Sequence, residues 1–248
     1  MTRSPLSTGV GDGGMRGTAL SARGVRMRLA RDELHVWLLP LDREPAEEAL
    51  DALSRDERWR AGRFRFPRDR RRYVAAHLAL RRTLASYVGV DPGTLRFERG
   101  EWGKPRLAGG NGPQFSLSHS GDLAIVAITG SLTVGADLER LRPMPGCVDL
   151  ARAYFAPAEL EALTGVDEPA RENAFWRLWT RKEALVKGAG LGLQLPLDTF
   201  EVPLEPDDAE VVLPGSGAWG VRTVALPTGH VASVATPGRP PAWQVHEG

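Results

Sequence analysis

Residues 114–139 read QFSLSHSGDLAIVAITGSLTVGADLE and contain three strand-like runs with no helical pattern between them. The runs are Gln114–Leu117, Leu123–Ile128 and Thr133–Leu138. Each has the length of a strand, and turn residues such as Gly121 separate them. Consecutive strands that are joined without a helix favour a small, mainly antiparallel sheet.

Helical patterns lie on both sides of this block of strands. A helix is predicted over 67–88, because Pro67 suits a helix start and Gly89 suits a helix end. Other helices are predicted to begin at Pro45 and to span 157–164 and 168–187. The remaining predicted strands are His35–Leu41, Leu95–Glu98, and short segments near 199–203, 209–213, 219–226 and 230–235. Helices and strands in separate blocks predict an α+β fold rather than an alternating α/β fold.

These blocks divide the chain into two similar halves, 32–130 and 131–236, which are predicted to be pseudo-symmetric. In each half, helices would pack on one small sheet. Residues 1–31, with Asp12 as their only acid, and residues 237–248 are predicted to be tails. The junction of two such halves is a natural place for a ligand.

The composition is that of a globular protein, since 42% of the 248 residues are hydrophobic and 25% are charged. It excludes disordered, collagen-like and membrane-spanning chains, because no apolar run approaches the roughly 20 residues of a membrane span. The net charge of +1 gives no overall case for a nucleic-acid partner. Cys147 is the single cysteine, so no internal disulfide or zinc site is expected. A cytoplasmic location is therefore expected.

Lysine is scarce in this chain. Of the 32 basic residues, only Lys104, Lys182 and Lys187 are lysine, and the other 29 are arginine. A coding bias toward arginine would leave lysine where a compact ammonium is needed and a planar guanidinium does not serve. Chance is the alternative interpretation, so the scarcity directs attention to these positions without assigning them a role.

Asp137 lies in the predicted strand 133–138, and Glu139 directly follows that strand. Side chains two residues apart along a strand project from one face, so both carboxylates do so. Two carboxylates this close repel each other unless solvent or a cation relieves the repulsion. Mg²⁺ binds such oxygen ligands and keeps positions open for water and phosphate. The pair therefore indicates either a magnesium site or a solvated strand face.

The helical segment Trp179-Thr-Arg-Lys-Glu-Ala-Leu-Val-Lys187 places Glu183 and Lys187 on one face, four residues apart. The plainest interpretation is a surface ion pair that contributes about 0.3–0.5 kcal/mol. The alternative assigns Glu183 to a metal ion or a proton, and Lys187 to a phosphate.

His119 lies at the end of a predicted strand, between Ser118 and Ser120 and before a glycine turn. Hydroxyls, turn amides and an imidazole together suit a bound phosphate. A Ser–His hydrolase is a competing interpretation, but the sequence has no Gly-x-Ser-x-Gly elbow to support it. A simple turn histidine is the third alternative.

Two further segments carry positive charge. Gly100-Glu-Trp-Gly103-Lys104-Pro105 is a tight turn, and its spacing differs from that of a P-loop. Residues 55–82 hold 11 arginines against only three acids, Asp56, Glu57 and Asp69. These arginines either form solvated helix faces or meet a polyanion, which could be a nucleic acid, an acidic protein or a ligand with several phosphates.

Four of these segments, taken in order, resemble the 4′-phosphopantetheinyl transferases of the surfactin-synthetase-activating (Sfp) type. They are residues 103–105, 115–120, 134–139 and 179–187, and the resemblance extends over about 50–240. It implies a monomeric enzyme of two pseudo-symmetric α+β halves with coenzyme A bound between them. Such an enzyme moves phosphopantetheine from coenzyme A to a serine of an apo acyl or peptidyl carrier protein and releases adenosine 3′,5′-bisphosphate.

The resemblance also implies which residues are catalytic. Asp137, Glu139 and Glu183 would hold Mg²⁺ at the pyrophosphate, and Glu183 would be the base for the serine hydroxyl. Lys187 would stabilise charge on the bridging oxygen. Phosphoryl transfer needs mainly positioning and charge neutralisation, which these groups can supply.

The remaining implied residues contact the coenzyme. Ser118 and His119 would meet the nucleotide phosphates, and Arg60 would meet the 3′-phosphate. The residues placed near the adenosine and its phosphates are Arg72, Arg99, Gly103, Lys104 and Pro105. Some relatives have lysine where this chain has Arg60, which arginine replaces without loss, because it binds phosphate at least as well.

The alternative function is a non-catalytic paralogue that binds coenzyme A without transferring anything. The three acids argue against it, because passive binding needs no general base. Neither interpretation calls for a nucleic acid or a membrane. Some arginines of residues 55–82 would then face the coenzyme, and others would attract an acidic carrier protein.

Overall fold

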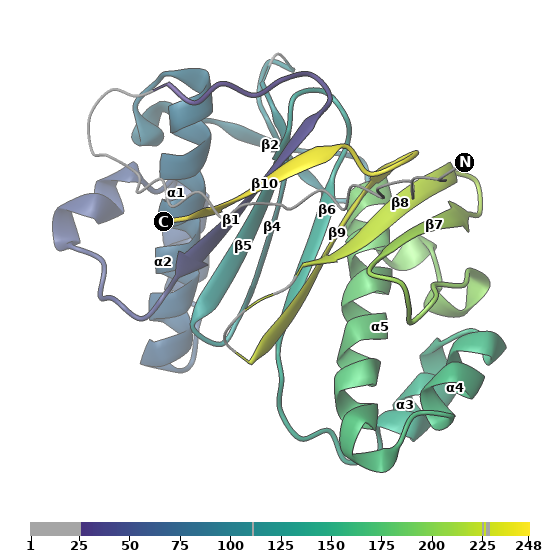
Figure 1. The fold of residues 1–248 in the computed structure, drawn as a ribbon. Helices are drawn as coiled ribbons and strands as arrows, with labels where there is room; N and C mark the ends of the chain where they lie inside the picture. The colour runs from purple at the N-terminus through teal and green to yellow at the C-terminus, as the bar shows by residue number, and fades with distance from the viewer. Residues whose placement is uncertain (1–25, 111, 225, 227–228) are drawn as a thin grey trace, which may run out of the picture.

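The computed structural model describes residues 26–110, 112–224, 226 and 229–248 (Figure 1). Its first long helix, α2 (Pro67–Val88), has the bounds that the sequence predicts. Pro67 stands at the helix start, where its missing N–H costs nothing. The helix ends at Gly89, whose φ of 80° is the left-handed conformation that glycine adopts without strain.

The first sheet has the strand order β10-β1-β5-β4. Its strands are β1 (Glu33–Pro40), β4 (Gln114–Ser120), β5 (Leu123–Thr129) and β10 (Ala242–Glu247). β5 is antiparallel to both of its neighbours, whereas β10 runs parallel to β1. The smaller elements of this half are the 3-10 helices Glu47–Ala52 and Pro92–Thr94, α1 (Arg55–Ala61), and the hairpin of β2 (Phe97–Arg99) and β3 (Pro105–Leu107).

The second sheet has the order β6-β9-β8-β7, and all its pairings are antiparallel. Its strands are β6 (Gly135–Arg140), β7 (Asp208–Leu213), β8 (Gly217–Val224) and β9 (His230–Pro237). The helices of this half are α3 (Cys147–Tyr154), α4 (Pro157–Thr164), α5 (Glu168–Ala189) and the 3-10 helices Gly192–Gln194 and Leu197–Thr199.

The two sheets pack together between the two long helices (Figure 1). α2 covers the first sheet through residues such as Leu84, which shares a core with Trp37. α5 covers the second sheet through a separate core around Phe175. Between the sheets, Val36 and Ile125 of the first belong to one cluster with residues of the second. This arrangement confirms the predicted α+β fold.

The predicted tail 237–248 is wrong for residues 242–247, which form β10. This strand pairs with β1, more than 200 residues earlier, from Glu33 opposite Ala242 to Leu38 opposite Glu247. Of the predicted tail 1–31, residues 1–25 lie outside the described residues. Residues 26–31 contact the first half, because Met27 N donates to Ser86 O at 2.9 Å and the Met27 side chain packs on the core.

Three local predictions differ from the structure. The helix expected from Pro45 is a 3-10 helix followed by α1, and the strand expected near 199–203 is absent. α3 was not predicted; it is short and packs against α4 and α5. Among the described residues, no helix combines the length and the apolar character that crossing a membrane requires.

Candidate functional site

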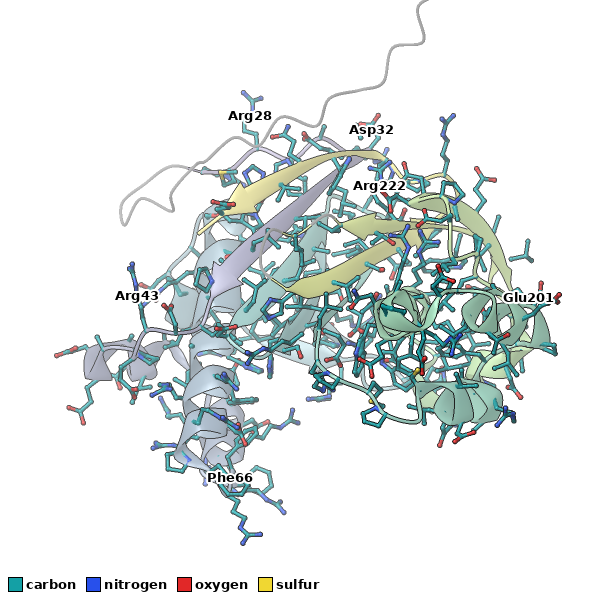
Figure 2. All side chains as sticks on the ribbon, turned by 60° about the horizontal axis from the view of Figure 1, so that its bottom comes forward. Arg28, Asp32, Arg43, Phe66, Glu201 and Arg222 are labelled. Carbon is teal, nitrogen blue, oxygen red and sulfur yellow. The ribbon has the colours of Figure 1, made fainter. Side chains whose placement is uncertain are left out.

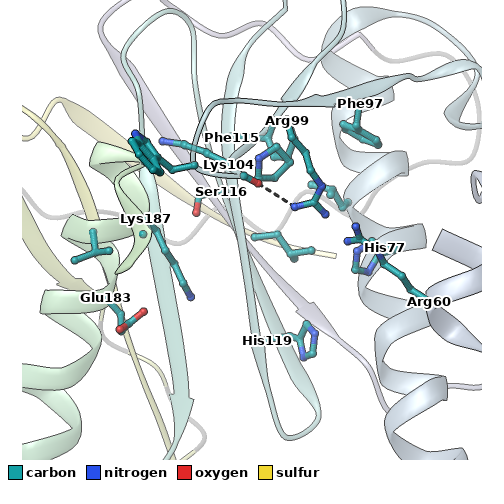
Figure 3. A pocket seen from close by; sticks show the side chains of 18 of the residues that line it. Arg60, His77, Phe97, Arg99, Lys104, Phe115, Ser116, His119, Glu183 and Lys187 are labelled. Carbon is teal, nitrogen blue, oxygen red and sulfur yellow. Dashed lines mark hydrogen bonds between the residues drawn. The ribbon is translucent and has the colours of Figure 1, made fainter. Parts of the chain in front are cut away.

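A cavity of about 1370 Å³ lies between the two halves (Figure 3). One wall comes from α1, α2, β2 and β4, and the other comes from α5 and the loop after it. The predicted site residues that line it are Arg60, Arg99, Gly103, Lys104, Pro105, His119, Glu183 and Lys187. The predicted residues Arg72, Ser118, Asp137 and Glu139 are not among those that line it.

Lys187 and Asp137 form the central ion pair of the site. Lys187 Nζ lies 2.5 Å from Asp137 Oδ1 and 3.3 Å from Ser118 Oγ. Ser118 Oγ in turn donates to Asp137 Oδ1 at 2.9 Å. The ammonium therefore neutralises the buried carboxylate from the cavity side, and Ser118 supports that carboxylate rather than facing the cavity.

Alternate serines of β4 join the two halves. Ala136 N donates to Ser116 Oγ at 3.0 Å, and Ser120 Oγ donates to Glu139 Oε2 at 2.8 Å. Ser118 makes the contact to β6 between them. Because strand side chains alternate, this serine row faces β6 while His119 points to the opposite face, into the cavity; of the three serines, Ser116 also borders the cavity. The sequence shows that serines alternate along this strand, but it does not show that they contact β6.

A glycine sets the distance between β6 and α5. A Cβ atom at Gly135 would collide with the carbonyl oxygen of Ala184 and the amide nitrogen of Gly188. Strand and helix backbones can therefore approach closely only because residue 135 has no side chain. This close approach brings Asp137, on β6, within reach of Lys187, on α5.

The carboxylates of the site influence one another. Burial raises the pKa of Glu183 above its ordinary value of 4.5, and Asp137 and Glu139 act in the same direction, while Lys187 opposes them. Burial also raises the pKa of Asp137, against the attraction of Lys187. Like charges raise the cost of ionisation, so a cation bound near these acids would relieve their repulsion.

The donor set fits a hard cation, although no preassembled cluster is present. Asp137 Oδ2 is buried and has no hydrogen-bond partner, and Glu139 and Glu183 offer further carboxylate oxygens. Across the part of the chain that the structure describes, no three His, Cys, Asp or Glu side chains gather closely enough to hold a metal ion. Here Lys187 supplies the positive charge at Asp137. The assignment of Asp137, Glu139 and Glu183 as magnesium ligands therefore stays a prediction.

The opposite wall of the cavity carries positive charge from Arg60 and Arg99. Figure 3 shows Arg60, His77 and His119 facing Glu183 and Lys187 across the space. Arg99 NH1 donates to Gly103 O at 3.0 Å and so closes the turn before Lys104. Such a wall suits an anionic ligand.

A buried ion pair forms part of this wall. Arg81 bonds to the Glu57 carboxylate at 2.7 Å and donates to the carbonyl oxygens of Pro92 and Leu95. Glu57 also closes a capping box with Ser54 at the start of α1. The pair fixes α1 against α2, and thereby fixes Arg60, one turn further along α1.

The three lysines occupy positions that a compact ammonium fits. Lys104 donates to Thr133 Oγ1, Val134 O and Gly188 O at 2.6, 3.0 and 2.7 Å, and burial lowers its pKa to about 8. It therefore joins the halves. Lys182 is fully buried and bonds to Glu159 at 2.7 Å and to two carbonyl oxygens. Of the three lysines, only Lys187 both bonds to neighbouring side chains and lies beside Glu183 in the cavity.

Comparison with known proteins agrees with this geometry. The chain is 38% identical to the 4′-phosphopantetheinyl transferase HetI of Nostoc sp. over 224 residues, which is 88% of this chain and 92% of that protein. The chain belongs to the 4′-phosphopantetheinyl transferase superfamily. It is also 31% identical to the 4′-phosphopantetheinyl transferase Sfp of Bacillus subtilis, over 71% of this chain and 78% of Sfp. The predicted resemblance to the Sfp type is thereby confirmed.

Two family models divide the chain between them. Residues 133–235 match the 4′-phosphopantetheinyl transferase superfamily, and residues 40–131 match the N-terminal part of 4′-phosphopantetheinyl transferases. The protein is thus a 4′-phosphopantetheinyl transferase, and the cavity lies between the parts that the two models describe.

Proposed function

We propose that this transferase takes 4′-phosphopantetheine from coenzyme A and attaches it to a serine of an apo acyl or peptidyl carrier protein. The observation that carries the proposal is the cavity between the halves. It has an acid and an ammonium, Glu183 and Lys187, on one wall and arginines on the other. A ligand with a pyrophosphate and a third phosphate matches that charge distribution. We expect the protein to be a monomer and to be located in the cytoplasm.

The reaction forms a bond from the serine oxygen to the phosphorus that carries pantetheine. The bond from that phosphorus to the bridging oxygen breaks, and this oxygen leaves with adenosine 3′,5′-bisphosphate. Glu183 accepts the hydroxyl proton, since within the described part of the chain nothing hydrogen-bonds its carboxylate. Its raised pKa makes it a better proton acceptor than an exposed glutamate.

Lys187 stabilises the leaving group. Its ammonium already lies at the base of the cavity beside Asp137, so it needs little reorganisation to face negative charge that develops on the bridging oxygen. Asp137, Glu139 and Glu183 would hold Mg²⁺, which when bound supplies charge neutralisation to the pyrophosphate. Arg60, Arg99 and His119 would orient the nucleotide.

Intact-protein mass spectrometry tests the proposal. An apo carrier protein incubated with this protein, coenzyme A and Mg²⁺ should gain the mass of one phosphopantetheine, and EDTA should abolish the gain. Glu183→Gln should lose nearly all transfer while it still binds coenzyme A, and Glu210→Gln, an exposed glutamate on β7, should leave transfer unchanged. Binding of coenzyme A without transfer to any carrier class would favour the non-catalytic alternative.

We further propose that the carrier protein docks beside the cavity on the corner between α1 and α2. Trp59 and Phe66 are 60% and 57% exposed there, and Figure 2 shows Phe66 at the projecting end of α2. Arg63 lies over the Trp59 ring at 4.7 Å. Exposed aromatics with arginines are typical of the centre of a protein interface, and the arginine excess of 55–82 suits an acidic partner.

Removing these rings should weaken the use of the carrier but not of coenzyme A. Trp59→Ala and Phe66→Ala should each raise KM for the carrier about 5- to 30-fold, which corresponds to about 1–2 kcal/mol. Val212→Ala, at a side chain on β7 that is 73% exposed, is the matched control and should change neither KM. Unchanged carrier KM in both ring variants, or a carrier KM that does not rise with added salt, would refute this docking surface.

A further inference from the structure

His77 lines the cavity from α2, next to Arg60, although no motif in the sequence marks it (Figure 3). Its Nδ1 lies 2.9 Å from the Tyr73 carbonyl oxygen, one helical turn earlier, and the two rings pack with their centroids 3.9 Å apart. A carbonyl oxygen only accepts hydrogen bonds, so Nδ1 carries a proton. Nε2 is therefore the ring nitrogen left for a ligand.

Charged groups reach His77 from several elements. Burial lowers its pKa below the ordinary 6.5, and His119 of β4 and Arg60 of α1 act in the same direction. The Tyr73 carbonyl and Glu57 oppose this, although Glu57 is itself paired with Arg81. The imidazole is consequently neutral at pH 7 in the free protein, and its Nε2 can only accept a hydrogen bond.

We infer that His77 is a phosphate-binding residue, which joins Arg60 at the 3′-phosphate of coenzyme A and binds it as the imidazolium. The inference rests on the proposed function. At pH 7 the phosphate monoester is mostly a dianion, whose oxygens accept hydrogen bonds and donate none, so a neutral Nε2 cannot bond to it. A phosphate monoester carries a charge of about −1.5 to −2 and favours the protonated ring beside it. Binding of coenzyme A therefore draws one proton from solvent onto Nε2.

Calorimetry measures this proton directly. Coenzyme A is titrated into the whole protein at pH 7 without carrier, in buffers with different enthalpies of ionisation, so that the slope of heat against buffer enthalpy gives the protons taken up. The same titration with 3′-dephospho-coenzyme A removes the phosphate that His77 is assigned to bind. This comparison needs no variant and does not depend on turnover.

The wild-type protein should take up more protons with coenzyme A than with the dephospho form. Its affinity for coenzyme A should fall by as much as about tenfold per pH unit above pH 7. The phosphate loses its own proton near pH 6, and the affinity that this adds makes the fall smaller. His77→Gln keeps a donor amide without needing a proton, so it should bind coenzyme A with fewer protons and a flatter pH profile. His77→Phe should bind it about tenfold more weakly or worse.

The outcomes distinguish the role of His77 from the proposed function. Equal proton uptake by the wild type and His77→Gln, or equal uptake with the two ligands, would overturn the role of His77 and leave the proposed function intact. A wild-type protein that binds neither ligand would refute the proposed function itself. A merely structural role for His77 would shift stability in the variants without removing the difference between the two ligands.

Discussion

Acid should weaken the attachment of β10, because His246 is buried there as a neutral ring. It is 3% exposed, and it stacks on Trp37 with the ring centroids 4.5 Å apart. Both of its ring nitrogens are buried without a hydrogen-bond partner. Burial, reinforced by neighbouring His35, lowers the pKa of His246 from 6.5 to about 4.

The sign and the size of the effect follow from that pKa. The unfolded chain binds this proton more readily than the folded protein does, so stability is complete above about pH 6.5 and is lost as the pH falls toward 4. A difference of 2.5 pKa units corresponds to about 3 kcal/mol in full, and about 2 kcal/mol of this is lost by pH 5. The pKa of His35 is lowered as well, again by burial, and this adds in the same direction.

Urea unfolding at pH 7 and pH 5, followed by tryptophan fluorescence, measures the loss. His246→Phe keeps the stacking on Trp37 and removes the titrating group, so it should lose about 2 kcal/mol less than the wild type between these two pH values. The carboxylates titrate equally in both proteins and cancel in the difference. The same loss in both proteins would show that His246 is not the buried neutral group described here.

Three further changes probe the site. Gly135→Ala should destabilise the fold by about 1–3 kcal/mol in urea unfolding and lower kcat, because it forces β6 away from α5. Gly165→Ala is the control, since a Cβ there makes only ordinary contacts, and an equal loss in both would contradict the close-approach argument. Lys104→Arg should cost about 1–3 kcal/mol in the same assay, because a planar guanidinium cannot reproduce the three bonds of the ammonium, and unchanged stability would refute that. On the acid side, kcat/KM should begin to fall at a pH above 4.5, the ordinary pKa of glutamate. The reason is that the pKa of Glu183 is raised and its carboxylate must be ionised to act. A value of kcat/KM that stays constant down to pH 4.5 would exclude Glu183 as the base.

Local signals were enough to predict the long helices. α2 has its predicted bounds because Pro67 and Gly89 are start and stop signals that act within one helical turn. α5 begins at Glu168 as predicted and extends two residues beyond the predicted end, to Ala189. β4 and β5 are antiparallel neighbours, as their short connection predicts, whereas β6 follows β5 closely in the sequence but pairs with β9 in the other sheet.

Features that depend on distant partners could not be predicted. β10 is six residues long, and its only neighbour in the sheet is β1, at the other end of the described chain. The same limit applies to Lys104, whose three acceptors lie 29 to 84 residues away, and to Ser118, which turned out to face β6. The residue types of the site were evident from the sequence, but the choice of face at each position required the tertiary structure.

The placement of β10 has a consequence for the order of events during translation. The ribosome makes β1 early and β10 after every other described element, so β1 must wait for the whole second half to be synthesised. During that interval one edge of the first sheet keeps unpaired amide and carbonyl groups, and such an edge invites association with other nascent chains. Completion of the fold is therefore a late event, in which the last strand to emerge pairs with β1 and replaces it as the edge of the first sheet.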